Sequence, residues 1–377
     1  MTADHLPGRA TPEGTRRFAE RFAALPGHFR CPDRLSLGSL GMGTRLGEPG
    51  GPDDLLYRTA VARALESGVN VFDTALAYRM QKSERNLGAA LRRAIASGSV
   101  ARDEVLVISK GGYLALDCDH VHSEVQAGVY LYDTYVRTGL VDPAQTVNGS
   151  HSLEPAFIRD QIERSRRNLG LATLDVYCVQ NPELHLHDKG PDAFRHILRK
   201  LVGVLEQAVA DGWIAAWGVS TWSGFFTPYT DKGHLSLSEL FDVALEVGGA
   251  DHHMRAIQFP YSVAMGEAAG LPSQFGGGVR PAGVLELLRD TGTAVFTTLP
   301  LVQGRAARGL PAFLREAFPE LESDAQIALQ FARSTPGVTT TLVGMRTPRH
   351  VQENLDLLRS APARSEVIER LFEHAAA

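Results

Sequence analysis

Short apolar segments alternate with longer amphipathic segments along almost the whole chain, and this alternation limits the possible folds more than any other feature. The short segments are nearly continuously apolar, which is typical of parallel strands covered by helices. Strands are expected at residues 36–42, 69–73, 104–109, 174–179, 213–219, 255–259, 294–298 and 339–343, and helices at 83–96, 155–168, 194–210, 236–247, 284–289 and 324–333. About eight β/α units close a parallel barrel, so the pattern predicts an α/β chain folded as a (β/α)8 TIM barrel.

A doubly wound sheet is the alternative fold for such an alternation. Its dinucleotide-binding form carries a Gly-x-Gly-x-x-Gly turn after the first strand. The glycine-rich segment at residues 38–43 has a different spacing, so we favour the barrel.

We divide the 377 residues into an N-terminal extension, residues 1–35, and a single barrel, residues 36–377. Residues 111–154 interrupt the barrel pattern, because they are rich in Tyr, Asp and His and show little helical or strand periodicity. Connections of this length are uncommon unless they bind a ligand or cover a site. Since this insertion leaves the C-terminal end of a strand, we expect it to lie over the active-site face and to help select the substrate. A surface loop without a catalytic role is the alternative.

The composition argues against several kinds of partner. Lys and Arg number 38 and Asp and Glu 43, and a net charge of −5 does not favour nucleic acid or anionic membranes. No apolar run approaches the roughly 20 residues of a membrane helix, and the first residues lack the apolar core of a secretion signal. Cys31, Cys118 and Cys178 lie far apart, so we expect neither disulfides nor a metal site, and the expected location is the cytoplasm.

Three polar residues stand where apolar strands end. Asp73 closes one strand, Lys110 follows the next, and Tyr78 comes five residues after Asp73. In a barrel these strand ends meet at one mouth. A tyrosine with its ordinary pKa of about 10 is a poor acid, but a neighbouring ammonium lowers that pKa and a carboxylate holds the ammonium in place. Alone, each residue is as readily a turn former or a packed aromatic, but together they predict a proton donor for a carbonyl oxygen that receives hydride.

The segments around these residues resemble the aldo-keto reductase superfamily. Residues 70–78 (Asn-Val-Phe-Asp-Thr-Ala-Leu-Ala-Tyr) and 83–88 (Ser-Glu-Arg-Asn-Leu-Gly) are similar to the family signature, Ser109-Lys110 to its lysine segment, and residues 160–177 to its next helix and strand. The resemblance runs in order from Ser36 to Leu358. It implies a (β/α)8 barrel that binds a nicotinamide cofactor without a Rossmann domain and uses Asp73, Tyr78 and Lys110 in catalysis.

Two positions depart from the pattern of that family. Gln180 stands in a Gln-Asn-Pro-Glu segment where the family usually has a catalytic histidine, and Thr298 stands where it often has an aromatic ring that stacks on the nicotinamide. A glutamine amide can orient and polarise a carbonyl but cannot titrate near neutral pH. We therefore expect Gln180 to be the fourth catalytic residue, with orientation rather than proton relay as its role. His151, His185 and His187 are alternative sources of an imidazole.

The resemblance also implies a cofactor site that is assembled from several strand ends. Its expected residues are Gly43, Thr44, Arg45, Ser220, Thr221, Gln258, Leu301, Gln303, Gly304, Arg305, Gly344, Arg346, His350, Glu353 and Asn354. Glycine turns beside a guanidinium suit a phosphate, and a helix N-terminus after the last strand favours an anion. Arg346 and Arg349 favour NADP(H) over NAD(H), although a solvated basic helix start is the alternative.

These residues predict an NADP(H)-dependent oxidoreductase that acts on a small-molecule carbonyl or alcohol. Tyr113, Tyr130, Tyr132, Tyr135 and His151 of the insertion point to a hydroxyl-rich substrate, such as a sugar or a specialised metabolite. A redox-neutral reaction on the same scaffold (epimerisation, dehydration or elimination) is one alternative, motivated by the glutamine and the insertion. A cofactor-sensing regulatory protein is another, but it has no need of a tuned acid. Assembly into homo-oligomers is left open.

Overall fold

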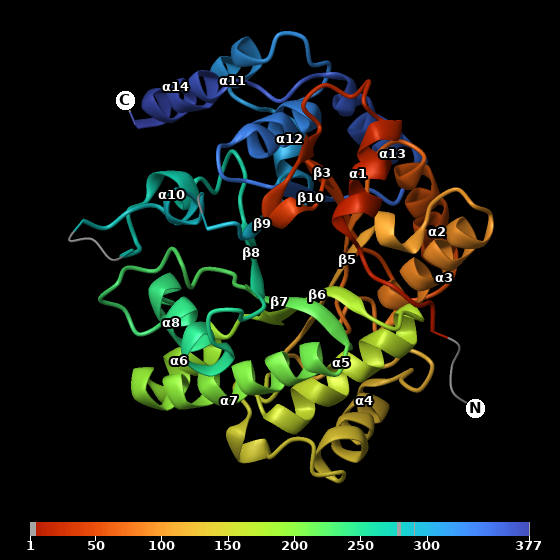
Figure 1. Cartoon of the computed structure of the whole chain (residues 1–377), viewed down its shortest axis with the longest axis vertical. Helices are drawn as coiled ribbons and strands as arrows, with labels where there is room; N and C mark the ends of the chain where they lie inside the picture. Colours follow the sequence, from red (N-terminus) through yellow and green to blue (C-terminus); the bar gives the residue numbers. More distant parts are fainter. Residues whose placement is uncertain (1–4, 277–279, 290, 377) are drawn as a thin grey trace.

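The computed structural model describes residues 5–276, 280–289 and 291–376. Its centre is a closed barrel of parallel strands in the order β10-β3-β4-β5-β6-β7-β8-β9 (Figure 1). The barrel strands are β3 (Leu40–Gly43), β4 (Val71–Asp73), β5 (Leu106–Gly111), β6 (Leu174–Gln180), β7 (Ile214–Ser220), β8 (Met254–Pro260), β9 (Ala294–Thr298) and β10 (Thr340–Gly344). This architecture confirms the predicted (β/α)8 barrel, and its strand C-terminal ends all lie at one end of the molecule.

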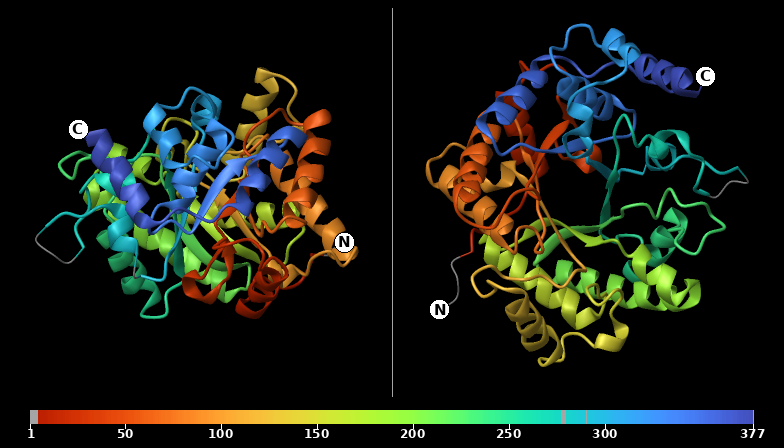
Figure 2. Two further views of the ribbon diagram at one scale, coloured as in Figure 1. Left: turned by 90° about the horizontal axis from the view of Figure 1, so that it is seen from above. Right: turned by 180° about the vertical axis from the view of Figure 1, so that it is seen from behind.

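Helices surround the barrel, as both views of Figure 2 show. Those that follow barrel strands are α2 (Pro52–Leu65), α3 (Lys82–Ala96), α5 (Pro155–Leu169), α7 (Pro191–Ala210), α8 (Leu237–Gly248), α10 (Val284–Leu288), α12 (Asp324–Ser334) and α13 (Pro348–Asp356). The further α-helices are α1 (Pro12–Arg21), α4 (Glu124–Leu131), α6 (Glu183–Lys189), α9 (Glu267–Gly270), α11 (Ala312–Ala317) and α14 (Ser365–Ala376). The short 3-10 or π turns are η1 (Pro32–Arg34), η2 (Arg102–Glu104), η3 (Tyr132–Val136), η4 (Pro143–Gln145), η5 (Val302–Ala307) and η6 (Leu357–Arg359). Over the described ranges, no helix is both long and apolar enough to cross a bilayer.

Close packing between neighbouring helices depends on one glycine of the signature segment. Gly88 of α3 lies so near the end of α5 that a Cβ atom there would come within 2.3 Å of the backbone oxygen of Leu169. Backbone cannot yield as a flexible side chain does, so a larger residue would push α3 away from α5. This contact fixes the helix that follows the Asp73–Tyr78 segment.

The strand predicted at residues 36–42 is corrected by the structure. It is two strands, β2 (Leu37–Gly38) and β3, separated at Ser39, whose amide donates to the backbone oxygen of His28 (2.6 Å). β2 pairs antiparallel with β1 (Phe29–Arg30), and only β3 enters the barrel. The other seven predicted strands lie within two residues of the observed ones.

The β1–β2 hairpin lies at the N-terminal end of the barrel, because β2 leads directly into the start of β3. Leu37 is fully buried and belongs to the cluster of side chains that fills the barrel interior, which also includes Val71, Ile108 and Phe296. A plugged interior leaves the opposite end of the barrel for ligands.

The 111–154 insertion contains a helix, α4, where little periodicity is expected from the sequence. An antiparallel bridge between Tyr113 and His151 closes its base. The segment is also tied to α3, where Arg85 pairs with Asp117 (2.5 Å). In the left view of Figure 2, α4 and α1 lie at opposite ends of the barrel.

Candidate active site

A cavity of about 1110 Å³ opens at the C-terminal end of the barrel. Seven of the eight barrel strands contribute their last residue to its wall, namely Gly43, Asp73, Gln180, Ser220, Pro260, Thr298 and Gly344. Pockets of roughly 300–1,000 Å³ hold drug-sized ligands, so this cavity has room for a large cofactor together with a small substrate. It is the natural place to examine the predicted catalytic residues.

Lys110 and Asp73 form a buried ion pair next to the cavity. The ammonium is 1% exposed and donates to Asp73 Oδ1 (2.6 Å) and to the backbone oxygen of Thr74 (2.7 Å). Burial lowers the pKa of Lys110, but the charge of Asp73, the hydrogen bond to it and the neighbouring Tyr78 together outweigh burial, so the pKa lies above its ordinary value. Lys110 is therefore a fixed cation at neutral pH.

Tyr78 lies against this ion pair, with Lys110 Nζ 4.8 Å from the centre of its ring. The chain turns sharply after it, because Arg79, Met80 and Gln81 all have left-handed backbone (φ 49°, 50° and 72°). Three such non-glycine residues in a row are a strained arrangement, of the kind found where a functional side chain is held in place.

The pKa of Tyr78 differs from the sequence-based prediction. Burial raises it, the positive charge of Lys110 opposes that effect, and the pKa lies above its ordinary value. Lys110 acts in the predicted direction, but the prediction of a lowered pKa is wrong for the protein without a ligand, because burial is the larger effect. The phenol is therefore protonated at neutral pH and can act as a proton donor.

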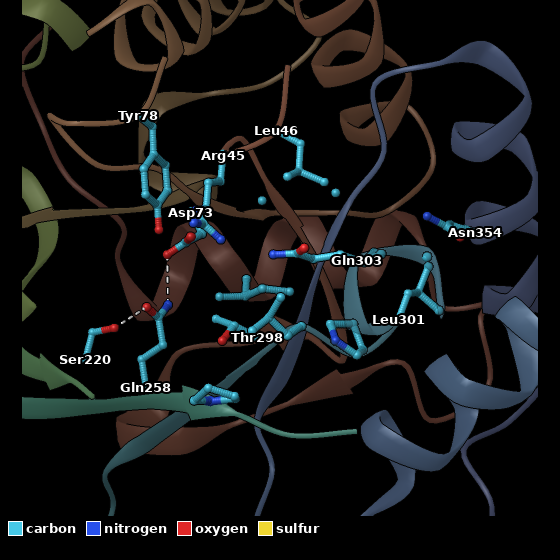
Figure 3. A pocket seen from close by; sticks show the side chains of 18 of the residues that line it. Arg45, Leu46, Asp73, Tyr78, Ser220, Gln258, Thr298, Leu301, Gln303 and Asn354 are labelled. Carbon is cyan, nitrogen blue, oxygen red and sulfur yellow. Dashed lines mark hydrogen bonds between the residues drawn. The ribbon is translucent and has the colours of Figure 1, made fainter. Parts of the chain in front are cut away.

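A chain of hydrogen bonds extends from this ion pair across the floor of the cavity (Figure 3). Ser220 Oγ donates to Gln258 Oε1 (2.8 Å), and Gln258 Nε2 donates to Asp73 Oδ1 (2.8 Å). Thr221, which accepts a hydrogen bond from the amide of Gly224 (2.9 Å), also lines the cavity. Three of the predicted cofactor residues, Ser220, Thr221 and Gln258, are thus brought together, and Gln258 is hydrogen-bonded directly to Asp73.

Gln180 lines the cavity at the end of β6, and the peptide bond that follows it is held from both sides. Its backbone oxygen accepts from His151 Nε2 (2.7 Å), and the amide of Asn181 donates to the backbone oxygen of Ser220 (2.6 Å). Asn181 has a left-handed backbone (φ 49°), and its side-chain amide donates to the hydroxyl of Tyr113 (2.7 Å). Asn181 is absent from the sequence-based site, although asparagine tolerates this conformation well and follows Gln180 directly.

Two buried histidines stand behind Gln180. His151 Nδ1 lies 3.1 Å from His185 Nε2, and burial lowers the pKa of each imidazole to about 4. A carbonyl only accepts, so neutral His151 carries its proton on Nε2 and accepts through Nδ1 from His185 Nε2. His185 Nδ1 is then a buried acceptor, and it has no partner in the structure.

Most of the predicted cofactor residues also reach the cavity. Those that line it are Gly43, Arg45, Ser220, Thr221, Gln258, Leu301, Gln303, Gly304, Gly344, His350, Glu353 and Asn354. Thr44, Arg305 and Arg346 are not part of its wall: the Thr44 hydroxyl donates to the backbone oxygen of Asp73 (3.0 Å), and Arg346 forms an ion pair with Asp53. Arg349, which the sequence indicates together with Arg346, also lines the cavity. Trp222 and Arg308 are among the wall residues missing from the predicted set, and only their place after strand ends could have signalled them.

The loop after β9 is strained where it forms the cavity wall. Leu299, Val302 and Gln303 all have left-handed backbone (φ 56°, 47° and 56°), and the next residue is Gly304 (φ 90°). For the β-branched Val302 this conformation is a marked outlier. On the same wall, Asn354 is buried and its side-chain nitrogen lacks a hydrogen-bond partner. An orphaned donor facing a cavity is a place where a polar ligand group gains a hydrogen bond.

One cluster in the described part of the chain has the composition of a metal site, namely Asp117, Cys118 and Asp119. Its carboxylates already pair with Arg85 and Lys82. The cluster belongs to the contact between the insertion and α3.

Comparison with known proteins identifies one family. The family model described as "Aldo/keto reductase family" matches residues 35–225. No curated protein sequence matches the chain.

Solved structures with a similar fold cover nearly the whole chain. An aldo/keto reductase from Klebsiella pneumoniae in complex with NADP and acetate is 19% identical, with 93% of this chain and 95% of that one covered and a TM-score of 0.60. A holo-form aldo-keto reductase from Bacillus halodurans is 18% identical, with 92% and 95% covered and a TM-score of 0.60. A glycerol dehydrogenase from Gluconobacter oxydans is 20% identical, with 93% and 95% covered and a TM-score of 0.63. At these identities the likeness is one of fold.

Proposed function

The chain belongs to the aldo/keto reductase family and is an oxidoreductase, and on that premise we propose that it transfers hydride between NADP(H) and the carbonyl or alcohol group of a small molecule. The observation that carries the proposal is the contact between Tyr78 and the Asp73–Lys110 ion pair at the cavity. A phenol, an ammonium and a carboxylate at adjoining strand ends make a proton donor next to space for a ligand.

Tyr78, Lys110 and Asp73 each have a different role in carbonyl reduction. Reduced nicotinamide, when bound, supplies the hydride that adds to the carbonyl carbon. Tyr78 donates its phenolic proton to the carbonyl oxygen, which leaves an alcohol and a phenolate. Lys110 stabilises the phenolate through its charge, and Asp73 holds Lys110 in place. The raised pKa of Tyr78 keeps the proton on the phenol until the carbonyl oxygen becomes negative.

Gln180 orients the carbonyl in this proposal. Its amide can donate a hydrogen bond to the oxygen that Tyr78 protonates. The fixed peptide between Gln180 and Asn181 limits where that amide can point. A hydroxyl-rich substrate, such as a sugar or a specialised metabolite, agrees with the polar side chains of Tyr113 and Asn181 in the cavity wall.

The part of the cavity that lies away from Tyr78, next to α13, fits NADP(H). The orphaned nitrogen of Asn354 and the N-terminus of α13 offer donors for the adenosine end. Arg349, in the first turn of α13, offers a guanidinium for the 2′-phosphate that distinguishes NADP(H) from NAD(H). Of the two arginines that the sequence indicates, we assign this role to Arg349 alone, because Arg346 is already paired with Asp53.

A redox-neutral reaction is the second candidate, and Gln180 is the observation that favours it. A site without a titrating group at this position is less suited to relaying protons, and an enzyme that oxidises and re-reduces its substrate shows no net change in cofactor. The catalytic residues would be the same, so only the balance of cofactor separates the two proposals.

The test follows NADPH absorbance with a panel of aldehydes, ketones and sugars, for the wild type and for Tyr78→Phe. Oxidation of NADPH in step with alcohol formation supports the reductase, and product without net NADPH change supports the redox-neutral reaction. Tyr78→Phe should lower kcat by about 10²–10⁴-fold, the usual contribution of a general acid, while the Kd for NADPH stays within twofold. Unchanged turnover in Tyr78→Phe contradicts the assigned proton donor.

A further inference from the structure

Arg45 occupies the catalytic end of the cavity. It follows Gly43 and Thr44 at the end of β3 and is part of the cavity wall. Figure 3 shows its side chain beside Tyr78 and Asp73, whereas Leu301 and Asn354 lie at the other side of the view. The positive charge of Arg45 opposes the rise in the pKa of both Tyr78 and Tyr113, so Arg45 lies near both phenols.

Arg45 differs from the other cations around the catalytic end because it has no counter-ion. Lys110 pairs with Asp73, and Arg79 pairs with Asp54 (2.6 Å). Arg45 forms neither an ion pair nor a hydrogen bond with any residue in the described ranges. A guanidinium that faces a cavity without a partner is a ready site for an anion, and its planar fork matches a carboxylate with two parallel hydrogen bonds.

Tyr113 supplies a second donor to the same region. Its hydroxyl oxygen accepts from Asn181 Nδ2 (2.7 Å), which leaves the hydroxyl hydrogen free to point at a ligand. Tyr113 and Asn181 are both cavity residues and adjoin Gln180. Arg45 and Tyr113 therefore offer donors to one ligand group close to the residues that handle the carbonyl.

We propose that the substrate carries a carboxylate, which Arg45 and Tyr113 bind while its carbonyl lies at Tyr78. This inference rests on the proposed function and specifies its substrate class: an aldehyde or ketone acid reduced to the hydroxy acid, or the reverse oxidation. It replaces the expectation from the sequence that Arg45 binds a cofactor phosphate.

The activity test compares two probes of nearly equal shape, succinic semialdehyde and 4-methylpentanal, in which an isopropyl group replaces the carboxylate. Arg45→Gln should lower kcat/KM for succinic semialdehyde by about 10–100-fold, the range expected for a hydrogen-bonded charge, and change 4-methylpentanal by less than threefold. Arg45→Lys keeps the charge but loses the fork, so its loss should be smaller. Arg16→Gln, on α1 at the other end of the barrel, is the matched control with no expected change.

The outcomes that overturn the proposal are distinct. If Arg45→Gln lowers kcat/KM for both probes equally and raises the Kd for NADPH, Arg45 binds the cofactor. If glyceraldehyde 3-phosphate responds to Arg45→Gln and succinic semialdehyde does not, the anion is a phosphate. An equal kcat/KM for succinic semialdehyde in wild type and Arg45→Gln removes the anion site altogether.

A binding measurement separates this inference from the proposed function. Succinate is titrated into the cofactor-free wild type and Arg45→Gln by calorimetry, with 4-methylpentanoate and 4-methylpentanol as the charged and neutral ligands of one shape. Binding of the carboxylates that is lost in Arg45→Gln supports the anion site even if no probe is turned over. Equal binding to both proteins overturns it, whether or not the chain is a reductase.

Discussion

At the scale of single residues, Gln180 stands where the family usually has a catalytic histidine, and this difference has the clearest consequence for the reaction rate. Gln180→Leu removes the amide at similar volume, so kcat for aldehyde reduction should fall by roughly 10–100-fold, because a hydrogen bond to an oxygen that becomes charged is worth about 1.5–3 kcal/mol. Gln180→His keeps a donor and adds a titrating group. Its kcat should therefore stay within tenfold of the wild type at pH 7 and acquire a pH dependence near the imidazole pKa. Stopped-flow measurement of single turnovers with saturating NADPH checks both, and an undiminished rate in Gln180→Leu contradicts the orienting role.

The proposed preference for NADP(H) over NAD(H) also depends on single residues. Arg349 faces the cavity and Arg346 is paired with Asp53, so Arg349→Gln should weaken NADPH at least tenfold more than NADH. Arg346→Gln should leave the ratio of the two Kd values within threefold and instead lower the free energy of unfolding, because Asp53 loses its cationic partner and keeps only the backbone amide of Glu48. Titration of each dinucleotide by fluorescence quenching gives the four constants. The reverse result, with Arg346 controlling the ratio, would contradict the assignment of the 2′-phosphate to Arg349 alone.

At the scale of elements, the base of the 111–154 insertion is joined to the end of β6 through His151 and Tyr113. His151→Phe keeps an aromatic ring in the buried position but removes the donor to the backbone oxygen of Gln180. We expect kcat to fall by about tenfold and KM for the carbonyl substrate to rise, because the peptide that carries Gln180 loses the hydrogen bond that fixes it. The Kd for NADPH should not change, since Arg349 and Asn354, which we assign to its adenosine end, lie on α13.

Two further variants distinguish this positioning role from a general loss of stability. His151→Gln can donate from nearly the same place as Nε2, so it should recover most of the lost kcat. His187→Phe alters the exposed histidine of α6 and should have no effect. If His151→Gln is as impaired as His151→Phe, the insertion does not act on Gln180 through this hydrogen bond.

The elements that the sequence predicts best are those with a strong burial pattern. β6 and β9 are nearly continuous apolar runs, and the observed bounds differ from the predicted ones by one residue or none. α4 buries none of its eight residues, so it has no amphipathic period by which to be recognised. The division at Ser39 depends on the pairing of β2 with Phe29 and Arg30, which lie outside the strand expected at residues 36–42, so the apolar pattern of that strand does not report it.

The sequence predicts those parts of the candidate site in which the positions of the strand ends alone determine which side chains meet. Asp73 and Lys110 stand at the ends of neighbouring strands, so their meeting follows from the barrel alone. The pairing of Arg346 with Asp53 depends instead on how the first turn of α2 meets the segment after β10, which sequence order does not determine. The net pKa of Tyr78 depends on the depth of its burial, which also appears only in the folded chain.

At the scale of the whole molecule, three buried histidines make the fold sensitive to acid. His28 hydrogen-bonds to Ser39 (3.1 Å) and to the backbone oxygen of Gly68 (3.0 Å), and burial lowers its pKa to about 3. His151 and His185, near the opposite end of the barrel, have pKa values of about 4. In the unfolded chain each of these histidines titrates near pH 6.5. Below that pH the unfolded state therefore binds more protons than the folded state, and the free energy of unfolding decreases as the pH is lowered.

The free energy of unfolding should therefore be constant above about pH 6.5 and fall below it by up to about 1.4 kcal/mol per pH unit for each of these histidines. Urea denaturation between pH 8 and pH 5 measures the slope. His28→Gln can keep a hydrogen bond and removes the titrating ring. The slope of its free energy of unfolding against pH should therefore be smaller than that of the wild type by the contribution of one histidine. The difference between the two proteins matters more than either slope, because Glu84 and Glu183, whose pKa values burial raises, act in the opposite sense in both. His122→Gln, at an exposed site, should reproduce the wild-type slope, and a His28→Gln slope equal to it would show that His28 does not destabilise the fold in acid.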